Sequence, residues 1–120
     1  KNGNDVTSAA IRLSRYVTGN NHVLFCGYHG WQDWYISKTS MSGGIPNEVG
    51  DYSHRFPYND LEALETLLNE LEGKTACIIM EPTSRILPNK GYLEGVRELA
   101  DKFKVILIFD EIVTGFRFHR

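Results

Sequence analysis

The chain has 120 residues, of which 42% are hydrophobic and 23% charged, an average composition for a globular domain with one modest core. Its net charge is -2 and it has no cluster of Lys or Arg, which argues against a nucleic-acid or membrane-surface binder. The longest apolar run, residues 105–109, is too short to span a bilayer, and no secretory signal pattern is present, so we expect a soluble, cytoplasmic protein.

The first half of the sequence predicts one helix, one strand and a long irregular segment. The helix is capped at Asn4 or Asp5 and extends to about residue 17. Its predicted buried face consists of Val6, Ala9, Ala10, Leu13 and Val17. The short apolar run over residues 22–26 predicts a strand. Residues 38–57 are rich in turn formers, and they predict a functional loop, an interface arm or a linker.

The second half predicts helices that alternate with strands. Asn59 or Asp60 caps a leucine-rich helix. An unbroken apolar run over residues 76–80 predicts a buried strand, an amphipathic pattern over 92–103 predicts a helix, and residues 105–109 predict a last strand. Apolar strands separated by amphipathic helices indicate an α/β fold with a mostly parallel sheet and helices on both of its faces.

The two ends of the sequence indicate a piece of a longer domain. The chain begins at Lys1 without an initiator methionine, and it ends at Arg120 shortly after the last predicted strand. No further segment follows that strand to cover its outer side. We therefore expect residues 1–120 to be an excerpt of a larger enzyme domain.

Cysteine and histidine residues give no signal for a metal site. Cys26 and Cys77 lie inside apolar runs, which predicts buried, reduced thiols. Neither belongs to a CxxC pair. The histidines also lack the spacing of metal ligands, and they are His22, His29, His54 and His119.

Polar residues follow each of the three predicted strands. These are Gly27-Tyr28-His29-Gly30, Glu81-Pro82 and Asp110-Glu111. Ligands of open parallel sheets bind beyond the carboxyl ends of the strands, so these residues are expected to line one site. The entry to the first helix, residues 1–4, offers free N–H groups to an anion such as phosphate. Each signal alone also fits a turn, a cap or a core residue, but together they indicate a pocket for a flat, anionic, nitrogen-containing ligand.

In order and spacing, these segments closely resemble the class-III aminotransferases that use pyridoxal phosphate (PLP). The resemblance covers nearly the whole chain and is most specific around Asp110, in residues 109–117. The Tyr-His-Gly turn and the Gly-Phe-Arg segment are most similar to the glutamate-1-semialdehyde aminomutase branch. The resemblance implies a fragment of the PLP-binding large domain of a fold-type-I enzyme, and it implies a homodimer, since family members are homodimers.

The resemblance also implies which residues bind the cofactor. The backbone amides of Gly3 and Asn4 are expected to bind the phosphate, although the family commonly has Ser or Thr where Asn4 stands. Tyr28 and Ile112 are expected to contact opposite faces of the pyridine ring. Asp110 is expected to be the catalytic carboxylate that pairs with the ring nitrogen and keeps it protonated.

Other matched residues are given broader roles by the resemblance. His29 is expected either to contact cofactor or substrate, or to hold its turn. Glu81 is expected to position other groups near the active site rather than to transfer protons. Residues 83–88 depart from the Gly-rich sequence usual at this place, so no substrate contact can be transferred to this loop. Arg117 is expected to be structural.

The covalent link to the cofactor is expected outside this sequence. In the family, the lysine that forms the Schiff base lies beyond the Asp110 motif, where this chain has ended. Five lysines lie in predicted loops or on exposed helix positions and do not match it: Lys38, Lys74, Lys90, Lys102 and Lys104. The resemblance implies an aminotransferase acting on an amino donor and a keto acid, aldehyde or keto sugar. An intramolecular aminomutase and a non-catalytic protein that retains the fold are the alternatives.

Overall fold

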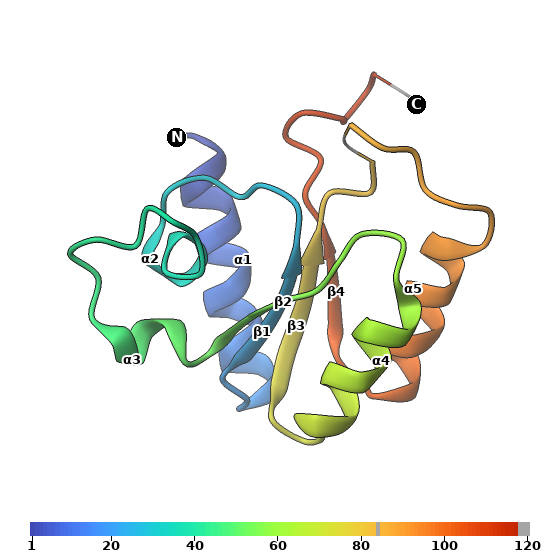
Figure 1. Ribbon diagram of the computed structural model, residues 1–120, viewed down its shortest axis with the longest axis horizontal. Coiled ribbons are helices and arrows are strands. Elements are labelled where there is room, and N and C mark those ends of the chain that lie inside the picture. The colour runs from blue at the N-terminus through green and yellow to red at the C-terminus, as the bar shows by residue number, and fades with distance from the viewer. Residues whose placement is uncertain (84, 118–120) are drawn as a thin grey trace.

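The computed structural model describes residues 1–83 and 85–117, and these form a four-stranded sheet with helices on both faces (Figure 1). The strands are β1 (His22–Cys26), β2 (Ser53–Arg55), β3 (Thr75–Met80) and β4 (Ile106–Phe109). They lie in the order β2-β1-β3-β4, and each neighbouring pair is parallel. The predicted α/β fold with a parallel sheet is therefore confirmed.

Helices α1 and α2 lie on one face of this sheet, and α4 and α5 lie on the other (Figure 1). The helices are α1 (Gly3–Thr18), α2 (Asp33–Ile36), α3 (Asn47–Gly50), α4 (Leu61–Glu70) and α5 (Tyr92–Lys102). The Asn2 side chain accepts the Asp5 N–H and caps α1, and Asp60 accepts the Ala63 N–H and caps α4. The cap of α1 thus lies two residues before Asn4 and three before Asp5, the two caps predicted for it. Of the two predicted caps of α4, Asp60 is the one observed.

Residues 38–57 are not structureless, contrary to the prediction. They contain α3 and the edge strand β2, which pairs with β1 in the register Val23–Ser53, Leu24–His54 and Phe25–Arg55. β2 was not predicted because it consists of only three residues, all of them polar, and only Ser53 is buried. A strand of this kind leaves no run of apolar residues in the sequence.

The core has two parts, one on each face of the sheet. Alternate residues of β1 and β3 point to opposite faces, as the two-residue period of a strand requires. Toward α4 and α5 the sheet presents Leu24, Cys26, Ile78 and Met80. Toward α1 and α2 it presents Val23, Phe25, Cys77 and Ile79.

The face that α1 buries differs from the predicted one. Val6, Leu13 and Val17 are 60%, 62% and 66% exposed. The face packed on β3 instead consists of Thr7, Ile11 and Ser14. Each of the two hydroxyls donates to a backbone carbonyl one turn earlier in the helix, so these small polar side chains are buried with their hydrogen bonds satisfied. The prediction assigned burial from polarity alone, and it was wrong for this helix.

Both cysteines are free and buried, as predicted. Burial raises the pKa of the Cys77 thiol to about 12. No helix within the described residues is long and apolar enough to cross a membrane. Among the residues that the structure describes, no group of three or more His, Cys, Asp or Glu side chains is placed to hold a metal ion. His119 lies outside the described residues.

Candidate functional site

The predicted site residues line one cavity of about 170 Å³ at the carboxyl edge of the sheet. They are Gly3, Asn4, Tyr28, His29, Glu81, Asp110 and Ile112. The cavity wall also contains Gly30, which belongs to the turn expected at this edge, and Thr7 and Val113, for which no role was predicted. Thr7 follows Gly3 by one helical turn, and this spacing was the signal that could have found it. A neighbouring cavity of about 210 Å³ is lined by Glu81 and by Gly27 of the predicted turn, but by none of the residues expected to bind the cofactor.

The N-terminus of α1 forms one side of this cavity. The N–H groups of Gly3 and Asn4 belong to the first turn, where a helix supplies no acceptor for them. A Cβ atom on Gly3 would lie 2.6 Å from Cδ1 of Ile112, so any larger residue would displace the Ile112 side chain. The side chain of Asn4 accepts the N–H of Trp31 at 3.2 Å and ties α1 to the turn after β1. This arrangement leaves two backbone donors and the positive end of a helix dipole beside the cavity.

Glu81, at the end of β3, holds the turn that carries Tyr28. Its Oε2 accepts the N–H of Tyr28 at 3.1 Å. A Cβ on Gly27 would lie 2.7 Å from that same oxygen, and Gly27 has a φ of +101°. The Tyr28 side chain is 64% exposed at the cavity. Glu81 therefore holds the backbone of this turn, while the ring of Tyr28 stays exposed at the cavity.

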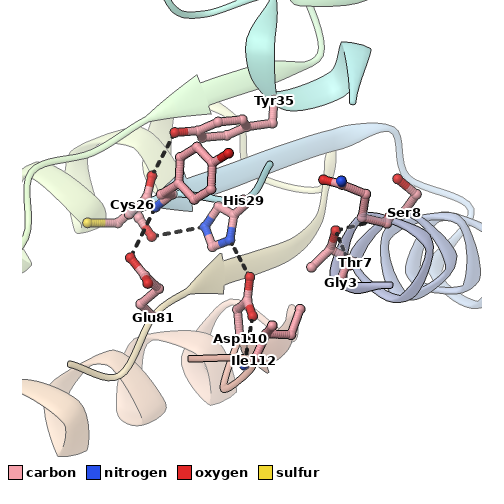
Figure 2. Close-up of polar contacts among 12 residues, drawn as sticks. Gly3, Thr7, Ser8, Cys26, His29, Tyr35, Glu81, Asp110 and Ile112 are labelled. Atoms are coloured by element: carbon pink, nitrogen blue, oxygen red, sulfur yellow. Dashed lines mark hydrogen bonds and ion pairs between the residues drawn. The ribbon is translucent and has the colours of Figure 1, made fainter. Parts of the chain in front are cut away.

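Asp110 lies directly after β4 and is joined to three segments of the chain. Its N–H donates to the carbonyl of Met80 at 2.8 Å, which extends the pairing of β4 with β3. Its Oδ1 accepts the N–H of Ile112 at 3.2 Å, and its Oδ2 lies 2.8 Å from Nδ1 of His29. The second ring nitrogen of His29 lies 3.0 Å from the carbonyl oxygen of Cys26 (Figure 2). His29 therefore lines the cavity with both nitrogens already engaged by protein atoms.

Aromatic side chains from α2 close off His29 from solvent. The imidazole stacks on the ring of Trp34, with centroids 5.8 Å apart and planes 30° from parallel. The edge of Tyr35 meets it at 5.5 Å, and the Tyr35 hydroxyl donates to the carbonyl of Gly27 at 3.2 Å. Burial raises the pKa of Tyr35 and raises that of Cys26 to about 11. The helix that sequence analysis missed is thus what buries the histidine.

This arrangement suits a flat ring that carries an anionic group and a protonated nitrogen. The N-terminus of α1 can bind the anion, and Asp110 can accept a hydrogen bond from the nitrogen. Tyr28 and the half-exposed Ile112 offer apolar surface to the ring. No lysine is among the residues found to line the cavity in the described part of the chain.

Solved structures with this fold include transaminases and glutamate-1-semialdehyde aminomutases. The omega-transaminase from Sphaerobacter thermophilus matches with a TM-score of 0.85 and 25% identity, over 94% of this chain and 31% of that one. The taurine:2-oxoglutarate aminotransferase from Bifidobacterium kashiwanohense, solved with PLP and glutamate, matches with a TM-score of 0.84 and 27% identity, over 96% of this chain and 32% of that one. The fold is that of the fold-type-I PLP transaminases.

The sequence itself belongs to the class-III aminotransferase family, whose family model matches residues 3–118. The chain is 42% identical to 3-aminobutyryl-CoA aminotransferase of Cloacimonas acidaminovorans, over 98% of this chain and 29% of the relative. It is 40% identical to glutamate-1-semialdehyde 2,1-aminomutase of Methanocaldococcus jannaschii, over 96% of this chain and 30% of the relative. The predicted family is confirmed, and the chain spans about 30% of the length of these relatives.

Proposed function

We propose that the whole protein is a PLP-dependent aminotransferase that moves an amino group from an amino donor to a carbonyl acceptor. In this proposal, residues 1–120 form part of its PLP-binding large domain. One observation carries the proposal: the buried carboxylate of Asp110 lines the same cavity as the N-terminus of α1. At this edge of the sheet, α1 thereby holds donors for a phosphate, and the residue after β4 supplies an acceptor for a ring nitrogen.

The residues present fit PLP in charge and in shape. The N–H groups of Gly3 and Asn4 would bind the phosphate at the helix N-terminus. Tyr28 and Ile112 would hold the ring between them, and Asp110 would accept the hydrogen bond of the ring N–H. When bound, PLP supplies an electron sink for the negative charge that develops at the amino carbon. The part of this chain in that chemistry is to bind the group, fix its orientation and keep its nitrogen protonated.

An intramolecular aminomutase of the glutamate-1-semialdehyde type is the second candidate. It is favoured by the 40% identity to an aminomutase, a value close to the 42% identity to an aminotransferase. An aminomutase returns no free keto product, whereas a transaminase does. A coupled assay for released keto product, run on the full-length protein with amino donors and acceptors, therefore separates the two.

A non-catalytic protein that retains the fold is the remaining alternative. The test is to incubate the full-length protein with PLP and to record the visible absorption of the bound cofactor. Borohydride reduction followed by peptide mapping then shows whether the cofactor is fixed to a lysine outside residues 1–120. Fixation supports the enzyme, and a protein that binds PLP without fixation, or not at all, contradicts it.

We further propose that the protein is a homodimer, as the family resemblance implies, and that it is cytoplasmic, as expected from its sequence. Residues 38–57, with α3 and β2, are proposed as the interface arm or substrate gate of this dimer. Light scattering of the full-length protein tests the dimer. Crosslinking from Met41, which is 68% exposed and would be replaced by cysteine, tests the proposed position of the arm.

A further inference from the structure

The proton count of the His29–Asp110 pair is constrained by its surroundings. The Cys26 carbonyl oxygen, 3.0 Å from Nε2, can only accept, so Nε2 of His29 must carry a hydrogen. Nδ1 and the Asp110 oxygen are 2.8 Å apart, and two bare lone pairs at that distance would repel. One further proton must therefore lie between them. It is carried either by the imidazole, giving an ion pair, or by the carboxyl group, giving a neutral pair.

Two contacts favour the ion pair. Oδ1 of Asp110 accepts the N–H of Ile112, a hydrogen bond that stabilises a carboxylate more than a neutral acid. The ring face of Trp34 covers the imidazole, and such a face attracts a cation. The side chains are 0% and 6% exposed, so water does not compete for either partner.

We propose that His29 is a positively charged positioning residue that holds Oδ2 of Asp110 and keeps this carboxylate ionised, with Oδ1 as the acceptor for the ring nitrogen. The inference rests on the proposed function for its cofactor, but the charge of His29 is a property of the protein alone. The Cys26 carbonyl fixes the orientation of the imidazole, so the ends of β1 and β4 are linked through one side chain. Asp110 thereby has a fixed rotamer and a compensated charge before any ligand binds.

Two amide variants of the full-length protein separate the contacts of His29. In His29→Asn the amide nitrogen can take the place of Nδ1 and still donate to Asp110. In His29→Gln it can take the place of Nε2 and still donate to Cys26. We expect His29→Gln to raise the PLP dissociation constant by about tenfold or more, because Asp110 loses both the positive charge and the hydrogen bond, and His29→Asn to raise it by less, because the hydrogen bond is kept and only the charge is lost. If His29 only holds its turn through Cys26, the order of the two variants is reversed, and that result overturns the proposal, as does unchanged binding in both.

The charge itself is measured in the apoprotein by histidine-specific ¹⁵N labelling, with His29→Asn used to assign the signals. We expect both ring nitrogens of His29 to give the chemical shifts of protonated nitrogens at neutral pH. One unprotonated nitrogen would overturn the proposed charge, whether or not either variant folds. A wild-type protein that binds no PLP would contradict the proposed function, while this measurement would still decide the state of His29.

Discussion

Gly30 is the position at which the smallest change of side chain should disturb the cavity most. Its φ is +95°, and a Cβ atom there would lie 1.5 Å from Oδ1 of Asn4. That oxygen accepts the N–H of Trp31 at 3.2 Å. In Gly30→Ala the Asn4 side chain must therefore swing away, and both the hydrogen bond and the link between α1 and the turn after β1 are lost.

The expected cost has two parts, and Gly44 offers a control for one of them. A left-handed conformation costs alanine about 1–2 kcal/mol. The lost hydrogen bond adds about 1 kcal/mol. Gly44 has a comparable φ of +85°, but a Cβ atom there meets nothing within 4 Å. Gly44→Ala therefore carries the conformational cost alone, and Gly30→Ala should cost about 1 kcal/mol more.

Both variants of the full-length protein should be compared with the wild type by urea unfolding and by PLP titration. We expect Gly30→Ala to lose about 1 kcal/mol more unfolding free energy than Gly44→Ala. It should also weaken PLP binding, because Asn4 lies where the phosphate is proposed to bind. A loss of about 1 kcal/mol would raise the PLP dissociation constant about fivefold, since 1.4 kcal/mol corresponds to about tenfold. Gly44→Ala should leave PLP binding unchanged. Equal losses in the two variants, or wild-type PLP binding in Gly30→Ala, would refute the reasoning.

Three further predictions concern chemistry, core and thiols. Asp110→Asn should lower amino transfer by about a hundredfold or more while the protein stays folded, because the ring nitrogen loses its charged acceptor; steady-state kinetics and circular dichroism check this. Leu68→Ala in α4 should cost about 2–5 kcal/mol, whereas the exposed Glu70→Ala should change stability by less than about 0.5 kcal/mol, both measured by urea unfolding. Burial raises the thiol pKa of Cys26 to about 11 and of Cys77 to about 12, so at pH 8 both stay protonated; mass spectrometry should find iodoacetamide adducts only after denaturation.

The elements with strong periodicity were predicted from sequence. The buried strands β1 and β3 appear as unbroken apolar runs, and α4 and α5 as amphipathic patterns with clear ends. The short elements α2, α3 and β2 were not, because four or three residues are too few to establish a period. The prediction of which face of α1 is buried was also wrong. The face that packs on the sheet contains Thr7 and Ser14, whose hydroxyls donate hydrogen bonds to backbone carbonyls of the same helix. Polarity scales do not record such hydrogen bonds.

The sequence predicts that the site residues lie close together, but it does not predict which of their side chains form hydrogen bonds with each other. Parallel strands bring their carboxyl ends to one edge, so Tyr28, Glu81 and Asp110 had to converge. The contact between His29 and Asp110 joins residues 81 positions apart and depends on which way each turn directs its side chains. Nothing in the residue order indicates that direction. The hypothesis for His29 therefore stayed divided between ligand contact and turn support until the geometry was known.

The turn after β1 gives two adjacent residues opposite surroundings. Tyr28 is 64% exposed, whereas His29 is 3% exposed. The turn is bounded by Gly27 and Gly30, with φ values of +101° and +95°, a conformation that other residues rarely adopt. Glu81 and Asn4 then hold its two ends through the N–H groups of Tyr28 and Trp31. This four-residue turn can therefore present the ring of Tyr28 to a ligand. Its next side chain, His29, anchors Asp110, the carboxylate proposed to accept a hydrogen bond from that ligand's nitrogen.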